Sequence, residues 1–139
     1  MKKKILTAIT LVIIASAVGT WYYVFVYSNT HHRDVTNEEG IAVTAKDLVK
    51  EFQTNETAAN NKYLNKAVEV IGEVSETKTD QAGNITIVLK SDDAFSNVFC
   101  TLKSGNPQPK QGAKVAVKGI CNGFLSDVVL NEAIVKNNF

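Results

Sequence analysis

Hydrophobic and polar positions divide the chain into two parts. Residues 5–27 form one uncharged, mostly apolar run of 23 residues, whereas the chain from residue 44 onward alternates apolar and polar positions in short periods. As a helix, the run would span about 35 Å, which exceeds the roughly 30 Å hydrocarbon core of a bilayer. We therefore predict one transmembrane helix at residues 1–27.

The flanks of this run predict its orientation. Lys2, Lys3 and Lys4 precede it, and basic residues beside a membrane span stay on the cytoplasmic side. We expect an uncleaved signal anchor with a cytoplasmic N-terminus and the rest of the chain outside, in the periplasm if the cell is Gram-negative. A cleaved signal peptide, with a small-residue site at Ala15 and Ala17, is the alternative and would export the same domain.

The next residues predict a stalk and two short helices. Residues 28–42 are polar and show neither a period of 2 nor one of 3.6, so we expect a flexible stalk before a folded domain at residues 43–139. Thr44 is a potential N-cap with Asp47 three residues later, and apolar residues on one face continue the helix to about Gln53. A second short helix is expected over residues 56–64.

From residue 66 onward the periodicity changes to 2, which predicts strands. Gly72 and Gly119 fall in the middle of two of them, where a closed barrel bends and crowding favours glycine. The pattern predicts a mainly β domain, a small closed five-stranded barrel capped by the N-terminal helix. The expected strands cover residues 67–75, 85–90, 97–103, 113–122 and 128–135.

The spacing of these positions resembles the tRNA_anti-like family of bacterial OB-fold proteins, over roughly residues 43–135. The resemblance implies a five-stranded Greek-key OB barrel in a small exported or lipid-anchored protein, and the family name suggests nucleic-acid binding. This chain departs from the lipid-anchored members in having a transmembrane helix. The matching positions are Leu48, Phe52, Asn55, Ala58, Tyr63 and Lys66, then Val68, Val70, Gly72 and Val74, then Val98 and Cys100, then Gly112, Val115, Val117, Gly119, Cys121 and Gly123.

An OB barrel usually binds ligands on the face of its second and third strands and on the loops beside it. Phe99 and Phe124 could stack on a base or a sugar, and Lys90 and Lys103 could meet an anion. Alternatively, Phe99 packs under a loop and Phe124 plugs one end of the barrel. The loops are residues 77–84 and 122–127, and the candidate binding residues are Thr86, Val88, Phe99, Thr101, Lys103 and Phe124.

Cys100 and Cys121 are the only two cysteines, and both fall on inward positions of predicted strands. In an oxidising compartment we expect a disulfide between them, worth about 3 kcal/mol in the chain-entropy model. Two buried free thiols are the alternative. We expect no metal site, because two sulfurs have no third and fourth ligands nearby in the sequence.

The candidate catalytic groups are sparse. His31 and His32 lie in the predicted stalk, where no rigid packing could hold a general base. Asp80, Asp92 and Asp93 lack the spacing of a calcium loop and read as turn carboxylates. We therefore predict no enzymatic activity and no cofactor.

The charge of the predicted exported part bears on its partner. From Asp34 onward there are 11 lysines and 14 acidic residues, a net charge of −3, whereas nucleic-acid-binding domains are normally basic. We predict a membrane-anchored binding or scaffolding module that acts outside the cytoplasm on an envelope protein, peptide or glycan. The alternative is single-stranded nucleic-acid binding through the face that carries Phe99.

Overall fold

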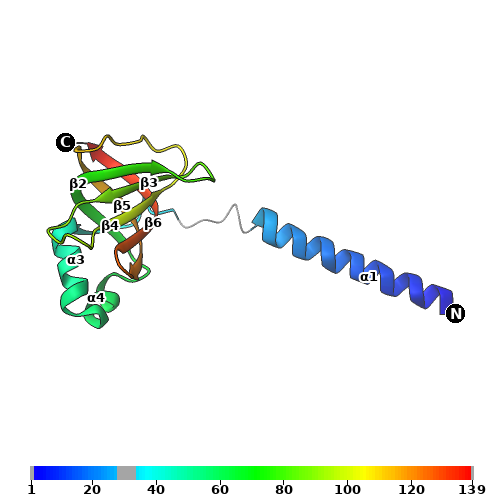
Figure 1. Cartoon of the computed structure of the whole chain (residues 1–139). Helices are drawn as coiled ribbons and strands as arrows, with labels where there is room; N and C mark the ends of the chain where they lie inside the picture. The colour runs from blue at the N-terminus through cyan, green and yellow to red at the C-terminus, as the bar shows by residue number, and fades with distance from the viewer. Residues whose placement is uncertain (1, 28–33, 139) are drawn as a thin grey trace. The chain divides into compact units, whose positions relative to one another are not determined.

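The computed structural model describes residues 2–27 and 34–138 of the 139-residue chain. The chain forms two compact units, an N-terminal helix and a β domain, which divide between Arg33 and Asp34 (Figure 1). His31 and His32, predicted to be polar linker residues, lie outside the described residues.

The N-terminal unit is one apolar helix. α1 covers Lys2–Tyr22 and continues into a short π-helical segment, η1, at Tyr23–Tyr27. The 19 residues Thr7–Phe25 are long and apolar enough to cross a membrane, and none of them is buried against protein. The predicted membrane-spanning element is therefore confirmed in its length and composition, which an N-terminal signal sequence would share.

Five strands of the second unit, β2 to β6, pair in a closed circuit and form a barrel (Figure 1). They are β2 (Ala67–Thr79), β3 (Ile85–Leu89), β4 (Val98–Leu102), β5 (Lys114–Phe124) and β6 (Val128–Asn138). The pairs β2–β3, β3–β4, β5–β6 and β2–β5 are antiparallel, and β4 lies parallel to β6. This closed order is that of the OB-fold, so the predicted mainly β, five-stranded Greek-key barrel is confirmed.

β2 is the longest strand because it serves both halves of the barrel. Residues 67–73 pair with β5, and the residues from Val74 onward pair with β3, with a register shift between Val74 and Glu76. A bulge of this kind lets a strand bend sharply. Gly119 marks a crowded position of the barrel, where β5 and β6 approach closely. A Cβ atom at Gly119 would lie 3.0 Å from the Cβ of Ala133 on β6.

A sixth strand lies outside the closed barrel. β1 (Ile41–Thr44) runs parallel to the first half of β2, with Ile41 opposite Val68 and Thr44 opposite Ile71. The sequence pattern assigned Ile41 and Ala42 to the stalk, because four residues are too few to reveal a period of 2. The division into anchor, stalk and domain stays a prediction, but the compact β unit already begins at Asp34 rather than at residue 43.

Two short helices cover one end of the barrel. α3 (Ala45–Thr54) begins at the predicted N-cap Thr44, whose hydroxyl accepts a hydrogen bond from the Asp47 N–H (3.1 Å) and donates one to the Asp47 carboxylate (2.7 Å). α4 (Glu56–Tyr63) follows, with the Asn55 side chain accepting from the Ala58 N–H (3.0 Å). Figure 1 shows both helices at the same end of the domain.

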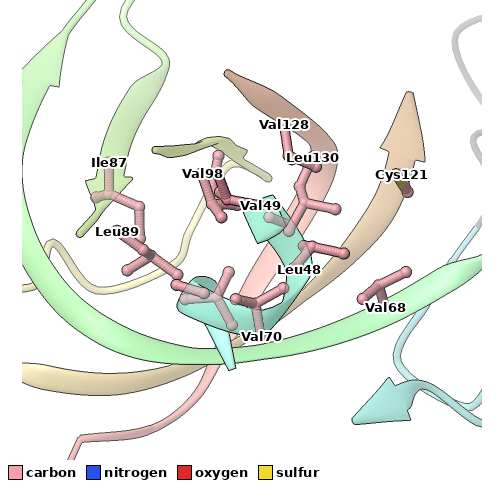
Figure 2. Packing of buried hydrophobic residues seen from close by; sticks show 14 of the residues in the cluster. Leu48, Val49, Val68, Val70, Ile87, Leu89, Val98, Cys121, Val128 and Leu130 are labelled. Carbon is pink, nitrogen blue, oxygen red and sulfur yellow. The ribbon is translucent and has the colours of Figure 1, made fainter. Parts of the chain in front are cut away.

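The core lies between these helices and the inner face of the barrel. Leu48, Val49 and Phe52 of α3 are fully buried, and Figure 2 shows Leu48 and Val49 pointing toward Val70 and Leu130 of the strands. Each large apolar side chain that leaves water contributes about 1.5–3 kcal/mol. The helix is therefore part of the core that holds the barrel closed.

Residues 34–40 form a strap over the outside of β5. Val35 in this strap is 1% exposed, and Lys118 of β5 is 3% exposed although it is charged. The Lys118 ammonium donates to the backbone carbonyl of Thr36 (3.4 Å) and to that of Glu38. A buried charge is tolerated when it is hydrogen-bonded in this way. The segment directly before β1 is therefore packed on the barrel.

Cys100 and Cys121 are free thiols, so the predicted disulfide is wrong. Both are fully buried, but Leu130 of β6 is the strand partner of each, and β6 therefore lies between them. Two strand spacings amount to roughly 10 Å, whereas a disulfide needs Cα atoms within about 7 Å. The alternation identified both inward positions correctly, but it carries no information on strand order.

Candidate functional site

The predicted binding residues of β3 and β4 lie together on one outer face. Thr86 is opposite Thr101, and Val88 is opposite Phe99. Phe99 is in turn opposite Val129 of β6. All five side chains are half-buried, so each exposes part of its surface beside its neighbours. We call this group, Thr86, Val88, Phe99, Thr101 and Val129, the barrel face.

Val129 is the member of this face that the sequence pattern did not select. It stands on an outward position of β6 beside Phe99. The period of 2 along β6 gave that outward position, but the parallel pairing with β4 was needed to place it here. With Val88 and Phe99 it forms an apolar stripe across three strands, and the Thr86 and Thr101 hydroxyls lie next to the stripe.

Acidic residues accompany the cations near this face. Lys78, opposite Thr86 on β2, pairs with Glu76 at 2.8 Å. Lys103, at the end of β4, lies 3.7 Å from the carboxylate of Asp34. Hydrogen bonds from Thr36, aided by Lys103, lower the pKa of Asp34. The margin of the face therefore carries paired rather than free positive charge.

Phe124 does not join the barrel face. Its ring stacks on Phe52 of α3, with centroids 5.9 Å apart and an interplanar angle of 19°, and it packs against the core at the helix-covered end. This position matches the alternative in which Phe124 plugs the barrel. The loop that follows presents Leu125 to solvent instead, 85% exposed.

Asp80 organises the β2–β3 turn. Its carboxylate accepts hydrogen bonds from the backbone N–H groups of Ala82 (2.9 Å) and Asn84 (2.8 Å), and from the Asn84 side chain (2.9 Å). These bonds, those from Asn84 first, lower the pKa of Asp80. Its oxygens are engaged in holding the turn, as expected of a turn carboxylate.

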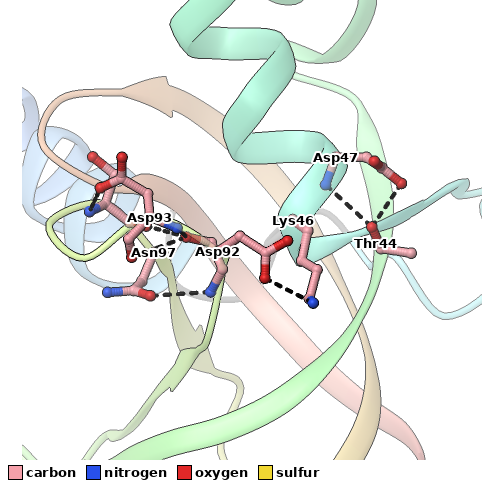
Figure 3. Close-up of polar contacts among 8 residues, drawn as sticks. Thr44, Lys46, Asp47, Asp92, Asp93 and Asn97 are labelled. Atoms are coloured by element: carbon pink, nitrogen blue, oxygen red, sulfur yellow. Dashed lines mark hydrogen bonds and ion pairs between the residues drawn. The ribbon is translucent and has the colours of Figure 1, made fainter.

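Asp92 and Asp93 have separate structural partners in the β3–β4 loop (Figure 3). Asp93 accepts from the N–H groups of Phe95 (2.7 Å) and Ser96 (2.8 Å) and from the Gln53 side chain (3.2 Å), and these bonds lower its pKa. Asp92 pairs with Lys46 at 2.7 Å. Within residues 2–27 and 34–138, no group of three or more His, Cys, Asp or Glu side chains is arranged to hold a metal ion.

The two cysteine thiols are buried. Burial raises the pKa of the Cys100 thiol and that of the Cys121 thiol, and a neutral, buried thiol is a poor nucleophile. The barrel face offers a ligand an aromatic ring, aliphatic groups and two hydroxyls, which suit noncovalent contact.

A closed five-stranded barrel with this strand order defines the molecule as an OB-fold protein. The family model tRNA_anti-like matches residues 1–134, and the chain belongs to the tRNA_anti-like family. The resemblance predicted from the spacing is therefore confirmed. Among curated proteins, none matches the chain significantly.

Comparison with solved structures finds likenesses at low sequence identity. A candidate nucleic acid-binding lipoprotein from Klebsiella pneumoniae subsp. pneumoniae is similar with a TM-score of 0.56 and 16% identity, over 69% of this chain and 92% of that one. A candidate aspartyl-tRNA synthetase from Leishmania major Friedlin has a TM-score of 0.46 and 14% identity, over 77% of this chain and 23% of that one.

Proposed function

We propose that this protein is a membrane-tethered OB-fold module that binds an extended envelope ligand, a protein segment, peptide or glycan, through the barrel face. The observation that carries the proposal is the stripe of Val88, Phe99 and Val129 across three strands, beside the strand partners Thr86 and Thr101, whose side chains carry hydroxyls. Half-exposed apolar and aromatic side chains with adjacent hydroxyls suit sugar rings and peptide side chains.

Charge supports an uncharged ligand for this face. Lys78 and Lys103 each stand beside a carboxylate, and residues 34–139 carry a net charge of −3, with 11 lysines and 14 acidic residues. A polyphosphate backbone gains most of its affinity from unpaired cations. A peptide or glycan does not need them.

A location outside the cytoplasm is part of the same proposal. The apolar helix is long enough to span a bilayer, and Lys2, Lys3 and Lys4 precede it, which favours a cytoplasmic N-terminus. The likeness in fold to a lipoprotein supports an envelope location. If the helix is instead removed as a signal sequence, the domain is released on the same side.

Single-stranded nucleic acid is the second candidate ligand. Phe99 offers a ring on which a base can stack, and the Klebsiella protein is described as a candidate nucleic acid-binding lipoprotein. This alternative makes a distinct prediction, because oligonucleotide affinity would fall steeply as salt rises.

Titration of the full chain in nonionic detergent tests both candidates. The probes are a peptidoglycan disaccharide-peptide, a pool of extended neutral peptides and oligothymidylate. Phe99→Ala should weaken binding of the envelope probe by about tenfold, the loss expected when one stacking ring is removed. Phe95→Ala is the matched control, because Phe95 is 89% exposed and lies in the β3–β4 loop rather than on a strand of the barrel face.

The outcomes separate the two proposals. Salt-sensitive oligothymidylate binding that is lost in Phe99→Ala, without binding of the other probes, would replace the first candidate with the second. If any probe binds and Phe99→Ala behaves like Phe95→Ala, the barrel face is not the binding site.

A further inference from the structure

A hollow of about 450 Å³ lies beside the N-terminal end of α3, where β3 ends and β5 begins. Three lysines line it from three elements: Lys46 from the first turn of α3, Lys90 after β3 and Lys114 at the start of β5. All three side chains are exposed. Ala45 and Ile71 provide apolar lining. We call this site the lysine hollow.

Pairing around Glu73 of β2 brings two of these lysines together. The Lys90 N–H donates to the Glu73 carbonyl (2.8 Å), and Lys114 is the strand partner of Glu73 on β5. The two lysines therefore flank Glu73, with Cα atoms roughly two strand spacings, about 10 Å, apart. Lys46 approaches from α3, which packs against β2. Figure 3 shows the Lys46 side chain.

The charges of the hollow are unbalanced. Lys46, Lys90 and Lys114 face two carboxylates, Glu73 and Asp92, in the lining. Asp92 holds Lys46 at 2.7 Å, in an exposed pair with 61% and 75% of the two side chains accessible. Within residues 34–138, no carboxylate lies within ion-pair distance of Lys90 or Lys114.

The N-terminal end of α3 does not supply the positive charge of the hollow. Thr44 already caps the helix by accepting the Asp47 N–H, so the first turn is supplied with an acceptor from within the chain. The unbalanced positive charge comes from the lysine side chains, which are long enough to turn toward a common centre.

We propose that the lysine hollow binds a phosphate group. A phosphate presents three or four oxygens in a tetrahedral arrangement and carries up to two negative charges, so it can meet ammonium groups that arrive from several directions. A carboxylate offers only two oxygens in one plane. Binding would draw Lys46 away from Asp92. The Lys46–Asp92 ion pair is exposed, and exposed ion pairs are weak.

The site is separate from the barrel face and does not rest on the proposed function. The face residues Thr86, Val88, Phe99, Thr101 and Val129 do not line the hollow. The phosphate could belong to a soluble compound or to a lipid headgroup, since both present the same chemistry to the lysines. A soluble phosphate compound and a phosphate-bearing lipid, tested separately, distinguish the two sources.

The test uses the full chain in nanodiscs of zwitterionic lipid, with inorganic pyrophosphate as the soluble probe and amide NMR shifts as the readout. We expect saturable shifts at Lys46, Lys90 and Lys114. Lys90→Gln with Lys114→Gln should weaken binding at least about tenfold, whereas Asp92→Asn should tighten it by releasing Lys46. In a second arm, nanodiscs containing phosphatidic acid shift the same amides without pyrophosphate if the headgroup is the ligand.

Lys62→Gln with Lys136→Gln is the charge-matched control, because these lysines pair with Glu51 and Glu69 outside the hollow. Equal weakening in the control and the Lys90/Lys114 pair would mean nonspecific attraction and would overturn the proposal. So would unsaturable shifts, or no shift in either arm. Phe99→Ala should leave pyrophosphate binding unchanged, so failure of the barrel-face proposal is read out separately.

Discussion

Lys118 on β5 donates a hydrogen bond from its side-chain ammonium to the backbone carbonyl of Thr36, 82 positions earlier in the chain. The same ammonium reaches the carbonyl of Glu38, and only 3% of Lys118 is exposed. This side chain thus joins the buried Val35 and the Asp34–Lys103 pair in holding the strap of residues 34–40 on the barrel, and it gives two backbone carbonyls a charged donor.

Lys118→Met is expected to free this strap while keeping most of the apolar stem. Two carbonyls lose a charged donor, so we expect the free energy of unfolding to fall by about 1–3 kcal/mol. Urea denaturation measures the loss, and hydrogen exchange should show lower protection in residues 34–40. Lys136→Met is the control: its pair with Glu69 is partly exposed and should be worth less than about 1 kcal/mol. Equal effects would contradict the role given to Lys118.

Gly119→Ala is expected to push β5 and β6 apart. The new methyl group would lie 3.0 Å from the Ala133 Cβ and 3.1 Å from the Asn131 carbonyl oxygen, and overpacking of this kind typically costs about 1–3 kcal/mol. Thermal unfolding of the single variant measures the cost. Adding Ala133→Gly should recover part of it, because the contact with the Ala133 Cβ disappears. No recovery would show that the strain lies elsewhere.

Cys100 and Cys121 are expected to stay reduced even when the protein is made in an oxidising compartment. Both thiols are fully buried and their strands are separated by β6. Maleimide should label neither cysteine in the folded protein and both in denaturant, without a reducing agent. An intact mass two hydrogens lighter, restored by reduction, would show a disulfide and would contradict the strand order.

Acid is expected to weaken the β3–β4 loop through Asp93. Hydrogen bonds from the Phe95 and Ser96 N–H groups hold its pKa below the ordinary aspartate value in the folded protein, so the unfolded chain takes up its proton at a higher pH. The stability that Asp93 contributes is complete above the ordinary aspartate pKa and is lost as pH falls through the lowered folded value.

Urea denaturation between about pH 7 and about pH 3 measures this loss. Asp93→Asn should flatten the decline, because the titrating group is gone. Asp80→Asn should act in the same direction, since hydrogen bonds in the β2–β3 turn lower the pKa of Asp80 as well. An unchanged slope in both variants would show that other carboxylates dominate the acid response.

The sequence pattern predicted those parts of the fold whose cause is local. Thr44 with Asp47 located the start of α3, and the alternation through Val68 and Val70 located β2 and its inward face. The strand ends were less predictable. β2 continues to Thr79, beyond the predicted end at residue 75. The pattern missed this part because Glu76 and Lys78 are exposed polar residues that form a surface ion pair.

Features set by distant pairing could not be read from the sequence. The alternation marked Cys100 and Cys121 as inward, but only the position of β6 shows that they are apart. The family resemblance and the period of 2 together predicted a shared face of Thr86, Val88, Phe99 and Thr101. They did not show that Phe124 lies apart from this face, because its stacking on Phe52 depends on the packing of α3. Lys46, Lys90 and Lys114 are too far apart in sequence to suggest a common hollow.

The strap and β1 also set the route by which tension enters the domain. A pull on the chain from before Asp34 acts first on the Asp34–Lys103 pair and the Lys118 contacts, then on the pairing of β1 with β2, and only afterward on α3 and the core. None of these outer contacts belongs to the strand pairings that close the barrel, so we expect them to separate first. If the N-terminal helix anchors the chain as proposed, we therefore expect a pull on the anchor to release the strap and β1 before it distorts the barrel face.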